Sequence, residues 1–218
     1  MTAVDPTDPN HVFFLRDRDI AISVDGGDTI NAVVTLPGGA HPTTISVPFG
    51  GGRTIAFGTV GAGVFLSPDG GGAWTRMGSL TPRWVLNIAW TPYPGGVGTW
   101  IIATSNGVYR MTSTDTEWGL VAGAGYVASD IEIGPRCSRR IYASFGAAIG
   151  PPFVEHRGGV IISTDGGGRW SSLTAGLDIH QAPITHLQVD PAFSRFVYAS
   201  VFGRGLWMYD ARVTPGCP

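Results

Sequence analysis

An eight-residue pattern recurs along the chain and constrains its fold more than any other feature. It runs from Ser163 to Trp170 (STDGGGRW) and returns from Ser67 to Trp74 (SPDGGGAW). An aspartate in such a pattern accepts hydrogen bonds from backbone N–H groups a few residues later, and the glycines supply positive φ angles. The pattern therefore predicts hairpin turns, pinned by Asp69 and Asp165, whose tryptophans anchor the outgoing strands.

Two weaker copies of the pattern occur elsewhere. One runs from Ser23 to Ile30 (SVDGGDTI) and keeps Asp25 but not the tryptophan. The other runs from Ser113 to Trp118 (STDTEW), where Asp115 remains and the glycines are lost. We expect that turn to be shorter and differently shaped, because no glycine is there to adopt positive φ. In the four copies together, we assign a structural role in the turn to Ser23, Asp25, Ser67, Asp69, Trp74, Asp115, Trp118, Ser163, Asp165 and Trp170.

A second repeat runs in step with the first. Short apolar stretches lead into Pro6, Pro48, Pro92, Pro135 and Pro191, which are spaced by about 42 to 56 positions, a period typical of propeller blades. Strands rich in β-branched and aromatic residues follow each proline. We therefore predict an all-β propeller of about five four-stranded blades, with units at 1–36, 43–80, 84–121, 126–175 and 183–210.

The predicted units form a single domain, 1–213, followed by a tail, 214–218. No fourth strand is expected in the last unit, so the edge after Asp210 is a candidate site of association. Two arrangements stay open. A closed five-bladed ring is favoured, and the alternative is a partial arc of a larger seven- or eight-bladed propeller, or an open arc that pairs with another chain.

Composition narrows the class of protein. The 218 residues are 43% hydrophobic and 14% charged, with 33 glycines and 16 prolines, which favours a packed, turn-rich domain over disorder. The net charge of −2 gives no reason to expect nucleic acid or an anionic membrane as partner. No apolar run is long enough for a membrane span. We expect no cofactor.

The recurring pattern resembles the Asp-box, or BNR, repeats of β-propellers such as sialidases, sortilin-type receptors, xyloglucan-cleaving glycoside hydrolases and photosystem II assembly factors. The resemblance implies that the boxes lie on one face and that ligands bind on the opposite face. It also implies a secreted or periplasmic protein, although Met1 to Pro6 does not resemble a signal peptide. One fold hosts many functions, so the activity stays open.

Loops on the expected ligand face supply the candidate binding residues. Trp84 offers a ring for stacking, and the long loop from Phe145 to Gly158 could form a flap. The full set of candidates is Arg16, Asp17, Arg18, Trp84, Tyr126, Glu155, His156, His180 and Arg204. His41, His156 and His180 fall on the same face but lack ligand spacing, so we expect no metal.

Two functions remain open at this stage. One is a non-catalytic binding or scaffolding propeller that recognises a protein or a glycan. The alternative is a glycoside hydrolase, xyloglucanase-like or sialidase-like, or a fragment of one, which would need a close carboxylate pair among Asp17, Asp178 and Glu155. The two cysteines, Cys137 and Cys217, fall in expected loops or tail. They are either unrelated thiols or a disulfide that would imply an oxidising compartment.

Overall fold

The computed structural model describes residues 1–48, 53–92, 98–146, 159–173 and 182–211. In these ranges the chain forms five antiparallel sheets, and within each sheet consecutive strands pair with one another. We number the sheets as blades 1 to 5 in chain order. Four of them have four strands and the last has three, as the sequence predicts.

Each blade is a meander of short strands. Blade 1 contains β1 (Thr2–Asp5), β2 (Asp8–Leu15), β3 (Asp19–Ser23) and β4 (Ala32–Thr35). Blade 2 contains β5 (Pro42–Ser46), β6 (Ile55–Thr59), β7 (Val64–Ser67) and β8 (Thr75–Arg76). Blade 3 contains β9 (Val85–Pro92), β10 (Gly98–Thr104), β11 (Gly107–Thr112) and β12 (Gly119–Ala122). Blade 4 contains β13 (Val127–Gly134), β14 (Cys137–Gly146), β15 (Gly159–Ser163) and β16 (Ser171–Ser172). Blade 5 contains β17 (Ile184–Val189), β18 (Phe196–Val201) and β19 (Gly205–Asp210).

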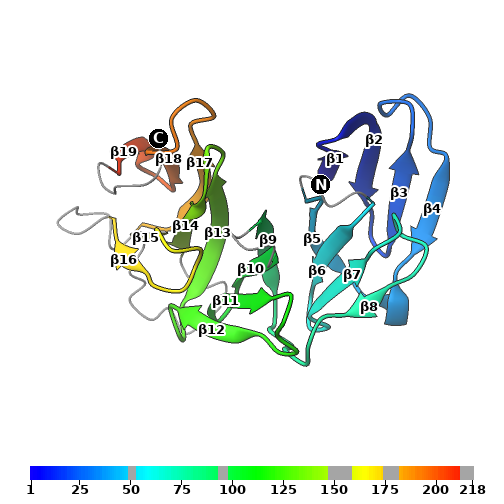
Figure 1. Cartoon of the computed structure of the whole chain (residues 1–218), viewed down its shortest axis with the longest axis horizontal. Coiled ribbons are helices and arrows are strands. Elements are labelled where there is room, and N and C mark those ends of the chain that lie inside the picture. Colours follow the sequence, from blue (N-terminus) through cyan, green and yellow to red (C-terminus); the bar gives the residue numbers. More distant parts are fainter. Residues whose placement is uncertain (49–52, 93–97, 147–158, 174–181, 212–218) are drawn as a thin grey trace.

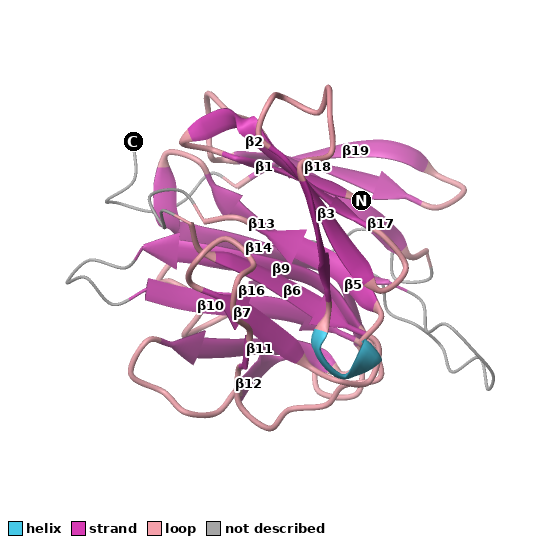
Figure 2. Cartoon of the chain, turned by 90° about the vertical axis from the view of Figure 1, so that its right-hand side faces the viewer, coloured by secondary structure: helices cyan, strands magenta, loops and turns pink. Residues whose placement is uncertain are grey.

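The blades follow one another around an arc (Figure 1), with the first strand of each blade toward the centre. Neighbouring blades pack through these inner strands, for example β5 with β9 and β13 with β17. Blades 1 and 5 lie at the two ends of the arc, and no described strand pair between them packs as neighbouring blades do. Closure into a ring, which the sequence favours, is therefore not seen among the described residues. Figure 2 shows one short helical segment, the 3-10 turn η1 (Pro37–Gly39), between blades 1 and 2.

The core lies between the blades. Side chains alternate along a strand, so in β6 Ile55 and Phe57 pack toward blade 1 while Ala56 packs toward blade 3. Four buried apolar clusters result, one between each pair of neighbouring blades. A blade buries both of its apolar faces only when it has a neighbour on each side.

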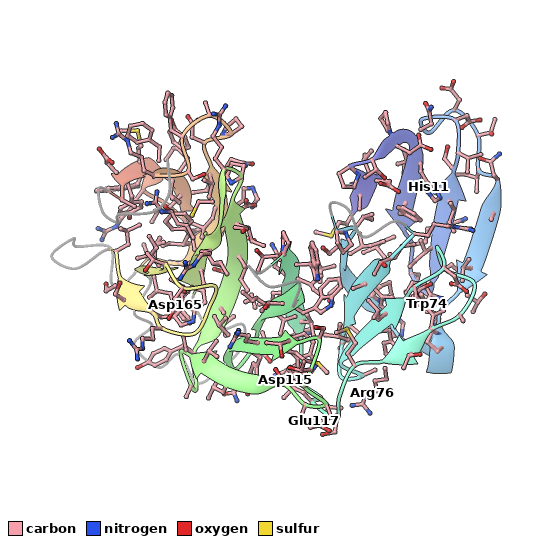
Figure 3. All side chains as sticks on the ribbon, viewed as in Figure 1. His11, Trp74, Arg76, Asp115, Glu117 and Asp165 are labelled. Atoms are coloured by element: carbon pink, nitrogen blue, oxygen red, sulfur yellow. The ribbon has the colours of Figure 1, made fainter. Side chains whose placement is uncertain are left out.

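The turns between the third and fourth strands have the predicted hydrogen bonds. In blade 2, Asp69 Oδ1 accepts the hydrogen bond of Ala73 N at 3.0 Å, and Ser67 Oγ accepts that of Gly71 N at 2.8 Å. The Ser67 hydroxyl in turn donates to Asp69 Oδ1 at 2.7 Å. The hydrogen bonds from Ala73 N–H first, and from the Ser67 hydroxyl second, lower the pKa of the Asp69 carboxyl. Gly71 has φ 104°, which favours glycine. Asp165 makes the equivalent turn in blade 4 (Figure 3).

The turn at Asp115 is built differently, as the lost glycines predict. Its carboxylate accepts the hydrogen bond of Thr112 N at 2.8 Å, so it reaches back toward β11 instead of forward. The box tryptophans are anchored between blades. Trp74 packs edge-on against Phe57 at 4.7 Å between ring centroids, and Trp118 Nε1 donates to a backbone carbonyl of blade 2 at 2.7 Å.

Cys137 corrects one expectation. It is the first residue of β14 and is not in a loop, because Gly134 pairs with Cys137 across a tight two-residue connection. Its side chain is buried and disulfide-bonded, so it is not a free thiol. Cys217 lies outside the described residues.

Candidate functional site

Two sets of loops meet at one end of the blades, which we call the loop face. One set joins the second and third strands of a blade, and the other leads from one blade to the next. Backbone hydrogen bonds tie the two sets together: Val60 N donates to His41 O at 3.0 Å, and Ser105 N donates to Trp84 O at 3.0 Å. The inner strands begin at this end, so the loop face surrounds their first residues.

Trp84 and Arg83 form a stacked pair on the loop face, between blades 2 and 3. The guanidinium carbon of Arg83 lies 4.2 Å from the centroid of the Trp84 ring, a cation–π geometry. The backbone of Trp84 is fixed on two sides, by a bridge to Val60 and by Ser105 Oγ at 3.2 Å. Trp84 is half-buried and Arg83 is exposed. The pair therefore places a half-buried indole ring, with the Arg83 guanidinium over one of its faces, and exposed guanidinium donors on a fixed backbone.

Four inner strands carry a β-bulge close to their first residues. The pairing skips one residue in β5, β9, β13 and β17. A bulge re-aims the side chains next to it. The residue that directly follows each bulge is polar, and these residues, which we call the polar row, are Thr44, Asn87, Asp130 and His186.

Asp130 is the centre of the polar row and is buried, with 3% of its surface exposed. One carboxylate oxygen accepts the hydrogen bond of Asn87 Nδ2 from blade 3. The other accepts that of Leu187 N from blade 5 at 2.8 Å. Ile131 N donates to the first oxygen at 2.9 Å. One buried carboxylate therefore joins the inner strands of three blades, and its hydrogen bonds are what make its burial tolerable.

His186 is oriented by the same carboxylate. Its Nδ1 lies 2.8 Å from Asp130 Oδ2. An ionised carboxylate only accepts hydrogen bonds, so Nδ1 carries a proton and Nε2 of the neutral ring is an acceptor. The imidazole is 62% exposed. The Asp130–His186 pair can therefore accept a hydrogen bond from a ligand hydroxyl, or take its proton.

Glu132 lies two residues beyond Asp130, on the same side of β13. It is half-buried. Burial, and secondarily the neighbouring Asp130 carboxylate, raise the pKa of Glu132 to about 7. Near neutral pH the two carboxyl groups of β13 are therefore in different environments, and Glu132 is partly protonated.

Six candidates from the sequence fall in the described part of the chain. Arg16, Asp17 and Arg18 occupy the β2–β3 loop and are exposed, and Asp17 Oδ1 lies 3.2 Å from His41 Nδ1. Tyr126 is exposed and meets the Phe145 ring edge-on at 6.5 Å.

Arg204 lies in the β18–β19 turn, where its backbone N donates to Val201 O at 3.0 Å. Within the described ranges, no hydrogen bond, ion pair or ring contact joins Asp17, Trp84 and Tyr126 to one another. The remaining candidates, Glu155, His156 and His180, lie outside the described residues, as does Asp178.

Asn87, Asp130 and His186 are absent from the sequence-based binding candidates. The repeat contains a signal for them. Each directly precedes the apolar residue that opens the repeating stretch before proline, at Ile88, Ile131 and Leu187. Comparing that one position between units would have found the polar row.

Two absences apply to the described residues only. No group of three or more His, Cys, Asp or Glu side chains is placed to hold a metal ion in them. Nor does any helix found there have the length and apolar character needed to cross a membrane.

No protein-family model matches the chain, and no curated protein matches it. Solved structures do resemble it. The GH74 enzyme of Niastella koreensis superposes with a TM-score of 0.75 at 19% identity, over 91% of this chain and 33% of that one. An ancestral GH74 enzyme superposes with a TM-score of 0.72 at 19% identity, over 95% of this chain and 30% of the enzyme. A chain of the COPII outer coat vertex on membranes superposes with a TM-score of 0.69 at 14% identity, over 94% of this chain and 56% of that one.

The chain thus spans about a third of the length of these GH74 enzymes. At such identities the similarity shows the fold alone. That fold is a β-propeller, so the predicted class is confirmed.

Proposed function

We propose that the chain is a non-catalytic binding module whose loop face recognises a glycan. The observation that carries this proposal is the Arg83–Trp84 pair, held rigidly on the loop face three residues before Asn87. Aromatic rings pack on the apolar faces of sugars, while the polar row provides partners for hydroxyl groups: the Asn87 amide and the outward Nε2 of His186. The near-neutral charge of the chain suits an uncharged ligand.

Calorimetric titration with a panel of neutral β-linked oligosaccharides, xyloglucan fragments included, tests the proposal. We expect binding by the wild-type chain and a loss of affinity of at least about tenfold in Trp84→Ala, because a well-packed aromatic anchor contributes more than about 1.4 kcal/mol. Phe193→Ala is the matched control, since Phe193 is an exposed aromatic in the β17–β18 connection, at the opposite end of the blades.

Unchanged affinity in Trp84→Ala would refute the assignment of the loop face. If the wild-type chain binds no member of the panel, the glycan proposal is wrong, and a protein ligand is the next class to test.

A second function, glycoside hydrolysis, is favoured by one observation. Glu132, with a pKa of about 7, and Asp130 lie on the same side of β13, and glycosidases pair a protonated carboxyl with an ionised one. Release of reducing ends from the same panel tests this function. Hydrolysis that Glu132→Gln abolishes would establish it, whereas no release by the wild-type chain would contradict it.

We further propose that the turns at Asp25, Asp69, Asp115 and Asp165 are Asp-box repeats, and that residues 1–213 form one propeller domain. The shared Ser–Asp hydrogen bonds of three of these turns support the first assignment. We also infer that the protein works in an oxidising compartment, consistent with secretion. The disulfide at Cys137 supports this inference.

A further inference from the structure

The last strand exposes the blade face that, in the described part of blades 1 to 4, packs against the next blade. In β19, Leu206 is 69% exposed and Met208 is 59% exposed. Leu206 lies opposite Ser200 of the second strand, as Val108 lies opposite Ala103 in blade 3 and Val160 opposite Ser144 in blade 4. Val108 and Val160 are both fully buried, at 0%. We call the exposed face of blade 5 the trailing face; it contains Tyr198, Ser200, Leu206 and Met208.

Blade 1 exposes the opposite kind of face at the other end of the arc. Phe14 lies opposite both Thr2 and Ala21, and Ala21 lies opposite Val33, so these side chains share one side of the sheet. Val33 is 50% exposed. Phe14 occupies the same position in blade 1 as Phe57 does in blade 2. The Phe57 side chain is fully buried against blade 1. We call this face the leading face; it contains Thr2, Val4, Phe14 and Val33.

The two faces are the two halves of one type of interface. Within the chain, the trailing face of each blade from 1 to 4 packs on the leading face of the next, and each of these four contacts buries an apolar cluster. The half presented by blade 5 and the half presented by blade 1 lack such a partner among the described residues (Figure 1). Both are largely apolar, and uncovered apolar surface of this kind marks interaction sites.

We propose that copies of this chain associate head to tail, with the trailing face of blade 5 of one copy packed on the leading face of blade 1 of another. A second copy is the occupant because it carries the complementary half, arranged as in the blade contacts inside the chain. Such a contact is heterologous, since it joins two different surfaces. The proposal rests on the packing of the blades and not on glycan binding, although His186, opposite Ser200, borders the trailing face.

Light scattering coupled to size-exclusion chromatography tests this association. We expect the mass of the wild-type chain to rise above that of the monomer as concentration increases from the micromolar to the near-millimolar range. Leu206→Asp and Val33→Asp each put a charge into one half of the interface, and each is expected to remain monomeric. Leu120→Asp is the matched control, because Leu120 is equally apolar and 45% exposed in β12, away from both faces.

Mixing the two monomeric variants distinguishes head-to-tail contact from any symmetric one. The Val33→Asp chain keeps an intact trailing face and the Leu206→Asp chain keeps an intact leading face. An equimolar mixture should therefore form a heterodimer. A wild-type chain that stays monomeric throughout, an association that survives either substitution, or a mixture that stays monomeric would each overturn the proposal. Circular dichroism of each variant separates loss of association from loss of the fold.

Discussion

Replacing Asp130 with alanine should destabilise the chain strongly, because this carboxylate connects three blades. The substitution leaves the buried N–H groups of Ile131 and Leu187 without their acceptor, and it also releases the Asn87 amide. A buried donor without a partner costs about 1–3 kcal/mol. Asn87 is half-buried, so its amide can hydrogen-bond to water instead. The loss of folding free energy therefore comes mainly from the two backbone donors and amounts to about 4 kcal/mol. That is a large part of the stability of an ordinary domain.

Urea denaturation followed by tryptophan fluorescence measures this loss. Asp190→Ala is the matched control, because Asp190 also accepts two backbone hydrogen bonds, from Ala192 N and Phe193 N, but does so in a turn that water reaches. We expect that control to lose about 1 kcal/mol or less. The reasoning fails if Asp130→Ala loses no more stability than Asp190→Ala.

Other predictions follow from the same contacts. Between pH 4.5 and about 7 the unfolded chain ionises Glu132 while the folded chain keeps it protonated, so stability falls as pH rises through this window. Glu132→Gln should therefore stabilise the chain by about 2–3 kcal/mol more at pH 8 than at pH 5, and equal effects at the two pH values in urea titrations would contradict this. Ser163→Ala leaves the buried Gly167 N without its acceptor and should cost about 1–3 kcal/mol, whereas Ser113→Ala in the altered turn should cost little; thermal unfolding compares them. Asp25 should titrate with a pKa of about 2 in carboxyl-detected NMR, because the hydroxyls of Ser23 and Thr29 donate to it; the stability it contributes is present above pH 3.8 and is lost as pH falls to 2. Finally, a thiol assay on the denatured, unreduced chain should find no free cysteine, and two reactive thiols would contradict the disulfide.

Local patterns were sufficient to predict most of the strands and turns, although they placed Cys137, the first residue of β14, in a loop. Gly107 and Gly159 each begin a third strand, because a glycine at the end of the loop leads directly into a β-branched run. The turn at Asp69 follows from its carboxylate and glycines. The missing fourth strand of blade 5 follows from the drift of the sequence after Asp210. Each of these features depends on residues close together in the chain.

Features that depend on contacts between blades could not be predicted in the same way. Asp130 is seen as a junction only when Asn87, 43 positions earlier, and Leu187, 57 positions later, are brought against it. Ring closure depends on the curvature added at every blade contact, and no local pattern records that curvature. Trp84 was a candidate from the sequence, but its stacking on Arg83 required the backbone of the loop.

The most direct test of ligand binding at the loop face is NMR mapping of a bound oligosaccharide. An oligosaccharide of the panel that binds the chain is added stepwise, and ¹H–¹⁵N spectra of the chain are recorded. The largest changes in chemical shift should fall on the backbone amides of Gly61, Ser105 and Leu187 and on the Trp84 indole N–H. The Gly61 and Ser105 amides hydrogen-bond to the backbone of the Arg83–Trp84 pair, and the Leu187 amide hydrogen-bonds to Asp130 of the polar row. Shifts concentrated instead on the box turns, at Gly71 and Gly167, would contradict the account and place the ligand at the opposite end of the blades.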